Sequence, residues 1–145
     1  MKSRDGDLSM RRARPLFRPK QSEDALHRDV ARYLEQVLTP ETVWFHPANG
    51  GARSQREGAK FKAQGVKAGV ADIVLVHDGR HFEIELKAAT GRQSPSQKAW
   101  QEALEKAGGK YVLLKSVEGV KMALWEFGIP TREKVYEWQG SSDNS

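Results

Sequence analysis

Two apolar segments separated by an Asp-Gly pair dominate the middle of the sequence and predict a β-hairpin. Residues 70–77 are almost continuously apolar, whereas apolar and polar side chains alternate in residues 81–87. Asp78-Gly79 is a strong signal for a two-residue turn, because both residues tolerate the positive φ angles that such turns require. The segments before and after this hairpin then decide the fold class.

Three segments around the hairpin have the pattern of amphipathic helices. They span residues 22–38, residues 94–108 and residues 116–128. Each begins at a serine that can cap a helix N-terminus, and each is followed by a proline or ends at a glycine. In the second helix, the expected apolar face is formed by Trp100, Ala103, Leu104 and Ala107.

Two further strands and one long polar segment complete the order of elements. Residues 42–46 and 111–114 are predicted strands because β-branched, aromatic and aliphatic residues are concentrated there. Residues 47–69 contain five glycines and a short predicted helix from Arg56 to Gln64. The resulting order, α, β, long loop, β-hairpin, α, β, α, predicts one mixed α/β domain with a central sheet flanked by helices.

The positive charge of the chain is concentrated at its start. Residues 1–20 hold seven of the 24 basic and two of the 19 acidic residues, so the rest of the chain is neutral overall. We expect a basic, disordered arm over residues 1–20, a domain over residues 21–130 and a tail over residues 131–145. Arms of this kind contact nucleic-acid phosphates, here through Arg11, Arg12 and Arg14, or serve as solubilising tails.

Three polar residues of the predicted hairpin form a candidate catalytic site. Asp72 interrupts an apolar strand, and Glu85 and Lys87 share one face of the partner strand. The hairpin brings the two carboxylates together, and they repel one another unless a proton or a cation lies between them. Mg²⁺ bound to carboxylate oxygens resolves this conflict and can activate water against a phosphodiester, while a nearby lysine stabilises the transition state.

Other residues have a structural alternative to a role in this site. A solvent-facing Glu-x-Glu-x-Lys strand is common, and Glu83 on the same face is expected to be solvated. Gln97 can reach the carboxylate end of the sheet or complete the capping box with Ser94. His46 can touch nucleic acid, although an ordinary, partly buried histidine is the simpler expectation.

The run from Ala48 to Pro130 resembles the virus-type replication-repair nuclease (VRR-NUC) domain, a branch of the PD-(D/E)xK nuclease superfamily with a restriction-endonuclease-like fold. The matching segments are Asn49-Gly50-Gly51 with Arg53, Gly69-Val70-Ala71-Asp72, Ile84-Glu85-Leu86-Lys87, Ser94-Pro95-Ser96-Gln97 with Trp100, and Gly108 with Tyr111-Val112. The E-x-K piece alone is weak evidence for this family, because it often arises by chance. The ordered set of segments is much more specific to the family. One departure is Ala71, which replaces the proline of the family pattern at a position that supplies no ligand.

The resemblance implies a role for each matching residue. Asp72, Glu85 and the Leu86 carbonyl would bind the metal, Lys87 would act on the attacking water or the transition state, and Gln97 would support the site. The superfamily often adds a glutamate from the first helix, for which Glu23 is the candidate. Its alternative role is that of an acidic residue that caps the N-terminus of that helix.

The resemblance also implies a substrate and an assembly. We expect a structure-selective DNA endonuclease that uses Mg²⁺ or Mn²⁺, with Holliday-junction resolution by a homodimer as the specific expectation. Its DNA contacts would come from a basic segment formed by Arg53, Arg56, Lys60, Lys62 and Lys67. The alternatives are a flap, branched-DNA or nicking nuclease of the same chemistry, and an inactive nucleic-acid-binding protein.

Several classes of protein are disfavoured by composition. The chain has no cysteine and therefore no disulfide or thiolate metal site. Without a long apolar run or a Walker-type loop, neither a membrane partner nor a nucleotide cofactor is expected. The predicted location is the cytoplasm of a bacterium or of a phage-infected host cell.

Overall fold

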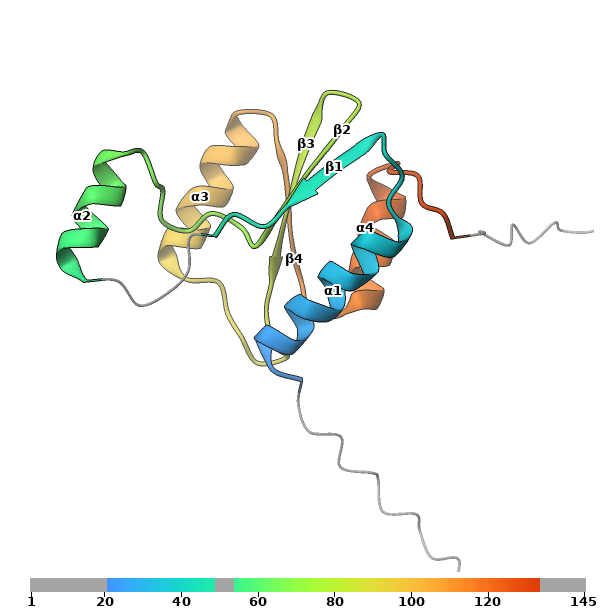
Figure 1. Ribbon diagram of the computed structural model, residues 1–145, viewed down its shortest axis with the longest axis horizontal. Helices are drawn as coiled ribbons and strands as arrows, with labels where there is room; N and C mark the ends of the chain where they lie inside the picture. Colours follow the sequence, from blue (N-terminus) through green and yellow to red (C-terminus); the bar gives the residue numbers. More distant parts are fainter. Residues whose placement is uncertain (1–20, 49–53, 134–145) are drawn as a thin grey trace, which may run out of the picture.

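A mixed four-stranded sheet with helices on both faces forms the body of the protein (Figure 1). The computed structural model describes residues 21–48 and 54–133, and all elements below lie in these ranges. In chain order they are α1 (Glu23–Val37), β1 (Thr42–Phe45), α2 (Gln55–Ala63), β2 (Ile73–His77), β3 (Arg80–Leu86), α3 (Pro95–Lys106), β4 (Lys110–Leu114) and α4 (Val117–Glu126). Every element predicted from the sequence is present, although β2 begins at Ile73 rather than at residue 70.

The strands lie in the order β1-β2-β3-β4, and the predicted hairpin forms the two central strands. The β1–β2 and β2–β3 pairs are antiparallel, whereas β3 and β4 are parallel and are connected through α3. Asp78 and Gly79 have φ angles of 49° and 70°, as a tight turn between twisted strands requires. This turn pairs His77 with Arg80 and therefore sets the register of the whole hairpin.

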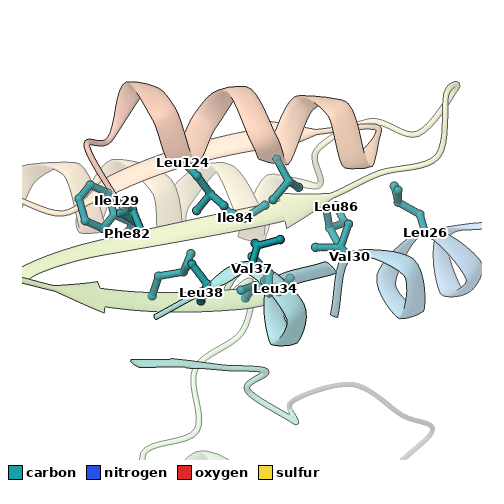
Figure 2. Close-up of a cluster of buried hydrophobic side chains, with 13 residues drawn as sticks. Leu26, Val30, Leu34, Val37, Leu38, Phe82, Ile84, Leu86, Leu124 and Ile129 are labelled. Atoms are coloured by element: carbon teal, nitrogen blue, oxygen red, sulfur yellow. The ribbon is translucent and has the colours of Figure 1, made fainter. Parts of the chain in front are cut away.

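The apolar core lies between the sheet and the helices α1 and α4 (Figure 2). Phe82, Ile84 and Leu86 project from alternate positions of β3 toward this side. Leu26 and Val30 are among the α1 residues that meet them at helical spacing. This packing fixes α1, and with it the first turn of the helix, at one end of β3.

The opposite face of β3 is buried but polar, and this bears on the apolar face that was expected for α3. Glu83, Glu85 and Lys87 are only 2%, 2% and 9% exposed and lie on the side of the sheet that α3 covers. No residue of α3 is fully buried, and Ala103 and Ala107 of its expected apolar face are exposed. Trp100 and Leu104 of the expected face are half-buried, so the expectation holds only in part. It fails for the two alanines because β3 beneath α3 presents hydrogen-bonding groups.

The remaining segments lie at the periphery. Helix α2 projects away from the sheet, beyond α3 in Figure 1, and none of its residues is buried. Residues 131–133, expected to belong to the tail, instead extend the domain: Thr131 forms a β-bridge with Leu38, and the Arg132 amide donates to the Val37 carbonyl at 2.7 Å. Among the described residues, no helix has the length and apolar character needed to cross a membrane.

Candidate metal centre

The hairpin register places Asp72 and Glu85 side by side. Ile73 pairs with Ile84, so Asp72 lies opposite Glu85 one position further along. The Leu86 backbone amide donates a 2.8 Å hydrogen bond to Asp72 Oδ2, which holds this carboxylate at the end of β3. The structure therefore brings together the two carboxylates that the sequence singled out.

Helix α1 adds a third carboxylate to this pair. Glu23 lies in the first turn of α1, and one oxygen from each of Glu23, Asp72 and Glu85 lies within 4.8 Å of the other two. The side chain of Ser22 caps the helix by accepting from the Ala25 amide at 3.1 Å. The cap is thus provided by Ser22, which leaves the exposed Glu23 carboxylate free to face the cluster.

Glu85 is a buried carboxylate that lies beside a second carboxylate and a lysine. Its Oε1 accepts from Gln97 Nε2 at 3.0 Å and lies 3.5 Å from Lys87 Nζ. Its Oε2 is fully buried and has no hydrogen-bond partner. Burial first, and the neighbouring Asp72 carboxylate second, raise the pKa of Glu85 to about 8, against the opposing charge of Lys87. A buried carboxylate oxygen with no donor is a costly feature that a bound cation would remove.

The donor set indicates the kind of cation that fits. Glu23, Asp72 and Glu85 offer only carboxylate oxygens, the hard ligands that Mg²⁺ and Mn²⁺ prefer over nitrogen or sulfur donors. Glu23 is exposed, whereas Glu85 is buried, so the cluster runs from the interior of the domain to its surface. The Leu86 carbonyl remains a predicted fourth ligand.

Gln97 performs both roles that its position in the sequence allowed. Its Oε1 accepts from the Ser94 amide at 2.8 Å, which completes the predicted capping box of α3. Its Nε2 donates to Glu85 at the same time. The start of α3 is also packed against Gly69, where a Cβ would lie 2.2 Å from the Ser96 carbonyl oxygen. The loop before Asp72 and the helix that carries Gln97 are therefore in direct contact.

Two side chains near the centre differ from their expected environments. Glu83, expected to be solvated, is buried and accepts from Trp100 Nε1 at 2.6 Å and from His81 Nε2 at 2.9 Å. His46 is exposed rather than partly buried, and its Nδ1 lies 2.5 Å from the Asp72 carbonyl oxygen. Its ring also meets that of His27 edge-on, with centroids 4.3 Å apart. No sequence signal distinguishes these contacts, because they depend on the pairing of β1 with β2 and on the packing of α1 and α3 against the sheet.

The predicted nucleic-acid contacts are only partly described by the structure. Arg56, Lys60 and Lys62 lie on α2 and Lys67 follows it, and all four are exposed. Arg53, the Asn49-Gly50-Gly51 segment and the arm with Arg11, Arg12 and Arg14 lie outside the described residues. Within the described part of the chain, α2 is therefore the element that presents the predicted basic segment to solvent.

Comparison with known proteins supports the expected fold. A solved structure described as a "VRR_NUC domain protein" superposes with a TM-score of 0.58 and 24% sequence identity, over 73% of this chain and 87% of that one. Searches with protein-family models and among curated proteins find no match. The chain thus has a restriction-endonuclease-like α/β fold, and more particularly the fold of a VRR-NUC domain, as the resemblance in its motifs predicted.

Proposed function

We propose that this chain is a VRR-NUC nuclease that hydrolyses phosphodiester bonds in DNA with the help of Mg²⁺ or Mn²⁺. The observation that carries the proposal is the buried, unpartnered Oε2 of Glu85, in a cluster whose other members are Asp72 and Glu23. A bound cation would give this oxygen a partner and would offset the repulsion among the three carboxylates.

Each residue of the centre has a defined task in this reaction. Glu23, Asp72, Glu85 and the Leu86 carbonyl would hold the cation, which supplies Lewis-acid stabilisation and favours deprotonation of water. Lys87, 9% exposed beside Glu85, is placed to orient the attacking water or to stabilise charge on the phosphate. Gln97 donates to Glu85 Oε1 and so would leave Oε2 for the cation. The oxygen of the attacking water forms a bond to phosphorus as this water gives up a proton to solvent, and one P–O ester bond breaks as the departing oxygen takes up a proton from solvent.

The basic segment supports DNA as the substrate. Exposed cations on a projecting helix suit a phosphate backbone and carry no information about base sequence. We therefore assign DNA backbone contacts to Arg56, Lys60, Lys62 and Lys67, with Arg53 and the arm residues Arg11, Arg12 and Arg14 as further contacts. Contacts of this kind favour selection of DNA structure over sequence.

The preferred substrate that we propose is a four-way junction, cut by a homodimer. A pair of centres related by a twofold axis can nick two symmetric strands, which matches the resolvase activity implied by the resemblance. Such an enzyme would act in DNA repair or recombination in the cytoplasm of a bacterium or a phage-infected cell. Cutting of flaps or nicked duplexes by the same centre is the second candidate.

Cleavage of labelled synthetic DNA tests these proposals. A four-way junction, a flap, a matched duplex and a single strand are each incubated with Mg²⁺ and with chelator. We expect paired, symmetric nicks on the junction in Mg²⁺ and none in chelator. Light scattering of the protein alone and with junction measures the oligomeric state, which should be a dimer.

Each other outcome changes a different part of the proposal. Metal-dependent cutting of flaps or duplex would retain the centre and reject the junction. A strict monomer would reject paired cutting by a homodimer. Binding without any cleavage would leave a nucleic-acid-binding protein that lacks turnover.

A further inference from the structure

Helix α3 is attached to β3 at a second point, one helical turn beyond Gln97. Trp100 Nε1 donates to Glu83 Oε2 at 2.6 Å, in parallel with the 3.0 Å bond from Gln97 Nε2 to Glu85 Oε1. Glu83 and Glu85 share one strand face, and residues three apart on a helix share one side. The two contacts therefore tie the same side of α3 to the same face of β3.

Hydrogen bonds add to the packing that holds α3 in place at this end. None of its residues is fully buried, although Trp100 and Leu104 are half-buried, so specific polar contacts matter for its position. Glu83 is only 2% exposed, and both of its carboxylate oxygens have partners, Trp100 on one and His81 on the other. Bonds from N–H donors to a carboxylate are short and strong, particularly where water is excluded.

The position of α3 determines where the Gln97 amide lies. Gln97 Oε1 is engaged by the Ser94 amide at 2.8 Å, so the side chain is rigidly attached to the start of its own helix. A shift or rotation of α3 therefore moves Nε2 away from Glu85 Oε1, since the side chain has no freedom to compensate. Glu85 would then keep only its 3.5 Å contact with Lys87 Nζ, and the orientation of its carboxylate within the acidic cluster would be less well defined.

We propose that Glu83 and Trp100 are positioning residues of the metal centre, which hold Gln97 against Glu85 and thereby orient the Glu85 oxygen that binds the cation. This inference rests on the proposed function, because it requires Glu85 to be a metal ligand. It assigns Glu83 a task distinct from that of Glu85, although both are buried carboxylates of one strand. Glu83 binds no cation; its two oxygens serve α3 and His81.

Calorimetric titration of the full chain with Mn²⁺, without DNA, tests the inference independently of cleavage. Trp100→Phe keeps an aromatic ring at the position and removes only the N–H donor. We expect Mn²⁺ affinity to fall by roughly 10-fold, the lower end of the range for loss of a group that supports a metal ligand. Trp125→Phe, at a position that is 75% exposed on α4, is the matched control and should leave the affinity unchanged.

Two further variants separate positioning from general support of the fold. Glu83→Gln retains an oxygen that can accept from Trp100, so it should keep more Mn²⁺ affinity than Glu83→Leu, with folding followed by circular dichroism. Adding Trp100→Phe to Gln97→Leu should cause no further loss, because Trp100 acts through Gln97. Independent, additive losses would show that Trp100 acts by another route and would overturn the inference.

The outcomes for the two proposals are distinct. If the wild-type chain binds Mn²⁺ and Trp100→Phe binds it equally well, the positioning role is wrong and the metal centre stands. If the wild-type chain itself binds no Mn²⁺, the metal centre and the proposed function are wrong, and the positioning role is rejected with them.

Discussion

The Asp72 carboxylate accepts a 2.8 Å hydrogen bond from the backbone amide of Leu86, which joins the residue before β2 to the end of β3. The donor belongs to the backbone, so it is present whatever side chain occupies position 86. The bond engages Oδ2, and the same carboxylate contributes one oxygen to the cluster with Glu23 and Glu85. Asp72 is thus placed by the sheet itself rather than by its side-chain neighbours.

Asp72→Asn should fold normally and lose metal-dependent cleavage. The new carbonyl can still accept from Leu86, which turns the NH₂ group, a donor that repels a cation, toward the cluster. We expect cleavage to fall by more than about 100-fold, because a ligand contributes more than the groups that support it. Gel-based cleavage rates and a thermal melt measure the two effects, and an unchanged rate would reject Asp72 as a ligand.

Lys87→Ala should abolish cleavage while junction binding is largely retained. Loss of this side chain removes a charge beside Glu85 and, with it, stabilisation of the transition state, which we expect to cost about 100-fold or more in rate. A gel-shift assay in Ca²⁺ measures binding separately. Since Lys87 is 9% exposed, circular dichroism is needed as a control: loss of folding would show that its role is structural.

The raised pKa of Glu85 predicts how metal-free stability depends on pH. Between its usual value of 4.5 and about 8, the folded state keeps a proton on Glu85 that the unfolded state has released. The contribution of this group to stability is therefore complete below the lower value and is lost as the pH rises through the upper one. Glu85→Gln mimics the protonated form, so in chelator its stability relative to the wild type should increase from about pH 4.5 to about pH 8 and then level off.

Thermal melts of both proteins across this range measure the effect. Mg²⁺ should raise the Tm of the wild type, most strongly at high pH, and should leave Glu85→Gln nearly unaffected. A difference in Tm between the two proteins that is the same at both ends of the range would contradict the assigned protonation of Glu85.

Gly69→Ala should destabilise the chain more than Gly65→Ala. Both glycines have positive φ angles, 80° and 92°, but only at Gly69 would the added Cβ collide with the Ser96 backbone. We expect a loss of roughly 2–4 kcal/mol at Gly69, from strain plus overpacking, and about 1–2 kcal/mol at Gly65 from strain alone. Urea unfolding measures both, and equal losses would indicate that the contact with α3 is easily relieved.

Removing charge from α2 should weaken DNA binding and reduce its dependence on salt. The triple variant Arg56→Gln, Lys60→Gln, Lys62→Gln should lower the slope of log affinity against log salt by about 2–3, since each phosphate contact contributes about 0.9. Its control neutralises three exposed cations on other elements, Arg32, Lys106 and Lys110. Deletion of residues 1–20 should lower the slope as well, and an unaltered slope would make the arm a solubilising tail.

Local patterns predicted most of the fold because they depend on neighbours in the sequence. The Asp78-Gly79 turn determines the register that pairs Ile73 with Ile84 and so brings Asp72 beside Glu85. The serine caps and helical spacing likewise located the helices to within a few residues. The extent of burial was less predictable. Glu83 shares its alternating pattern with solvent-facing strands, yet it is buried on a central strand, where Trp100 of α3 donates a hydrogen bond to it.

The sequence by itself therefore determined the hairpin, the order of elements and the pairing of Asp72 with Glu85, since turn geometry and side-chain periodicity are short-range properties. Only the tertiary structure decided that Glu23 joins these carboxylates, that α3 rests on a polar strand face, and that one oxygen of Glu85 is buried without a partner. Each of these depends on the packing of α1 or α3 against β3, between residues distant in the chain. Such packing depends on the combined shape and polarity of whole elements, which no local pattern contains.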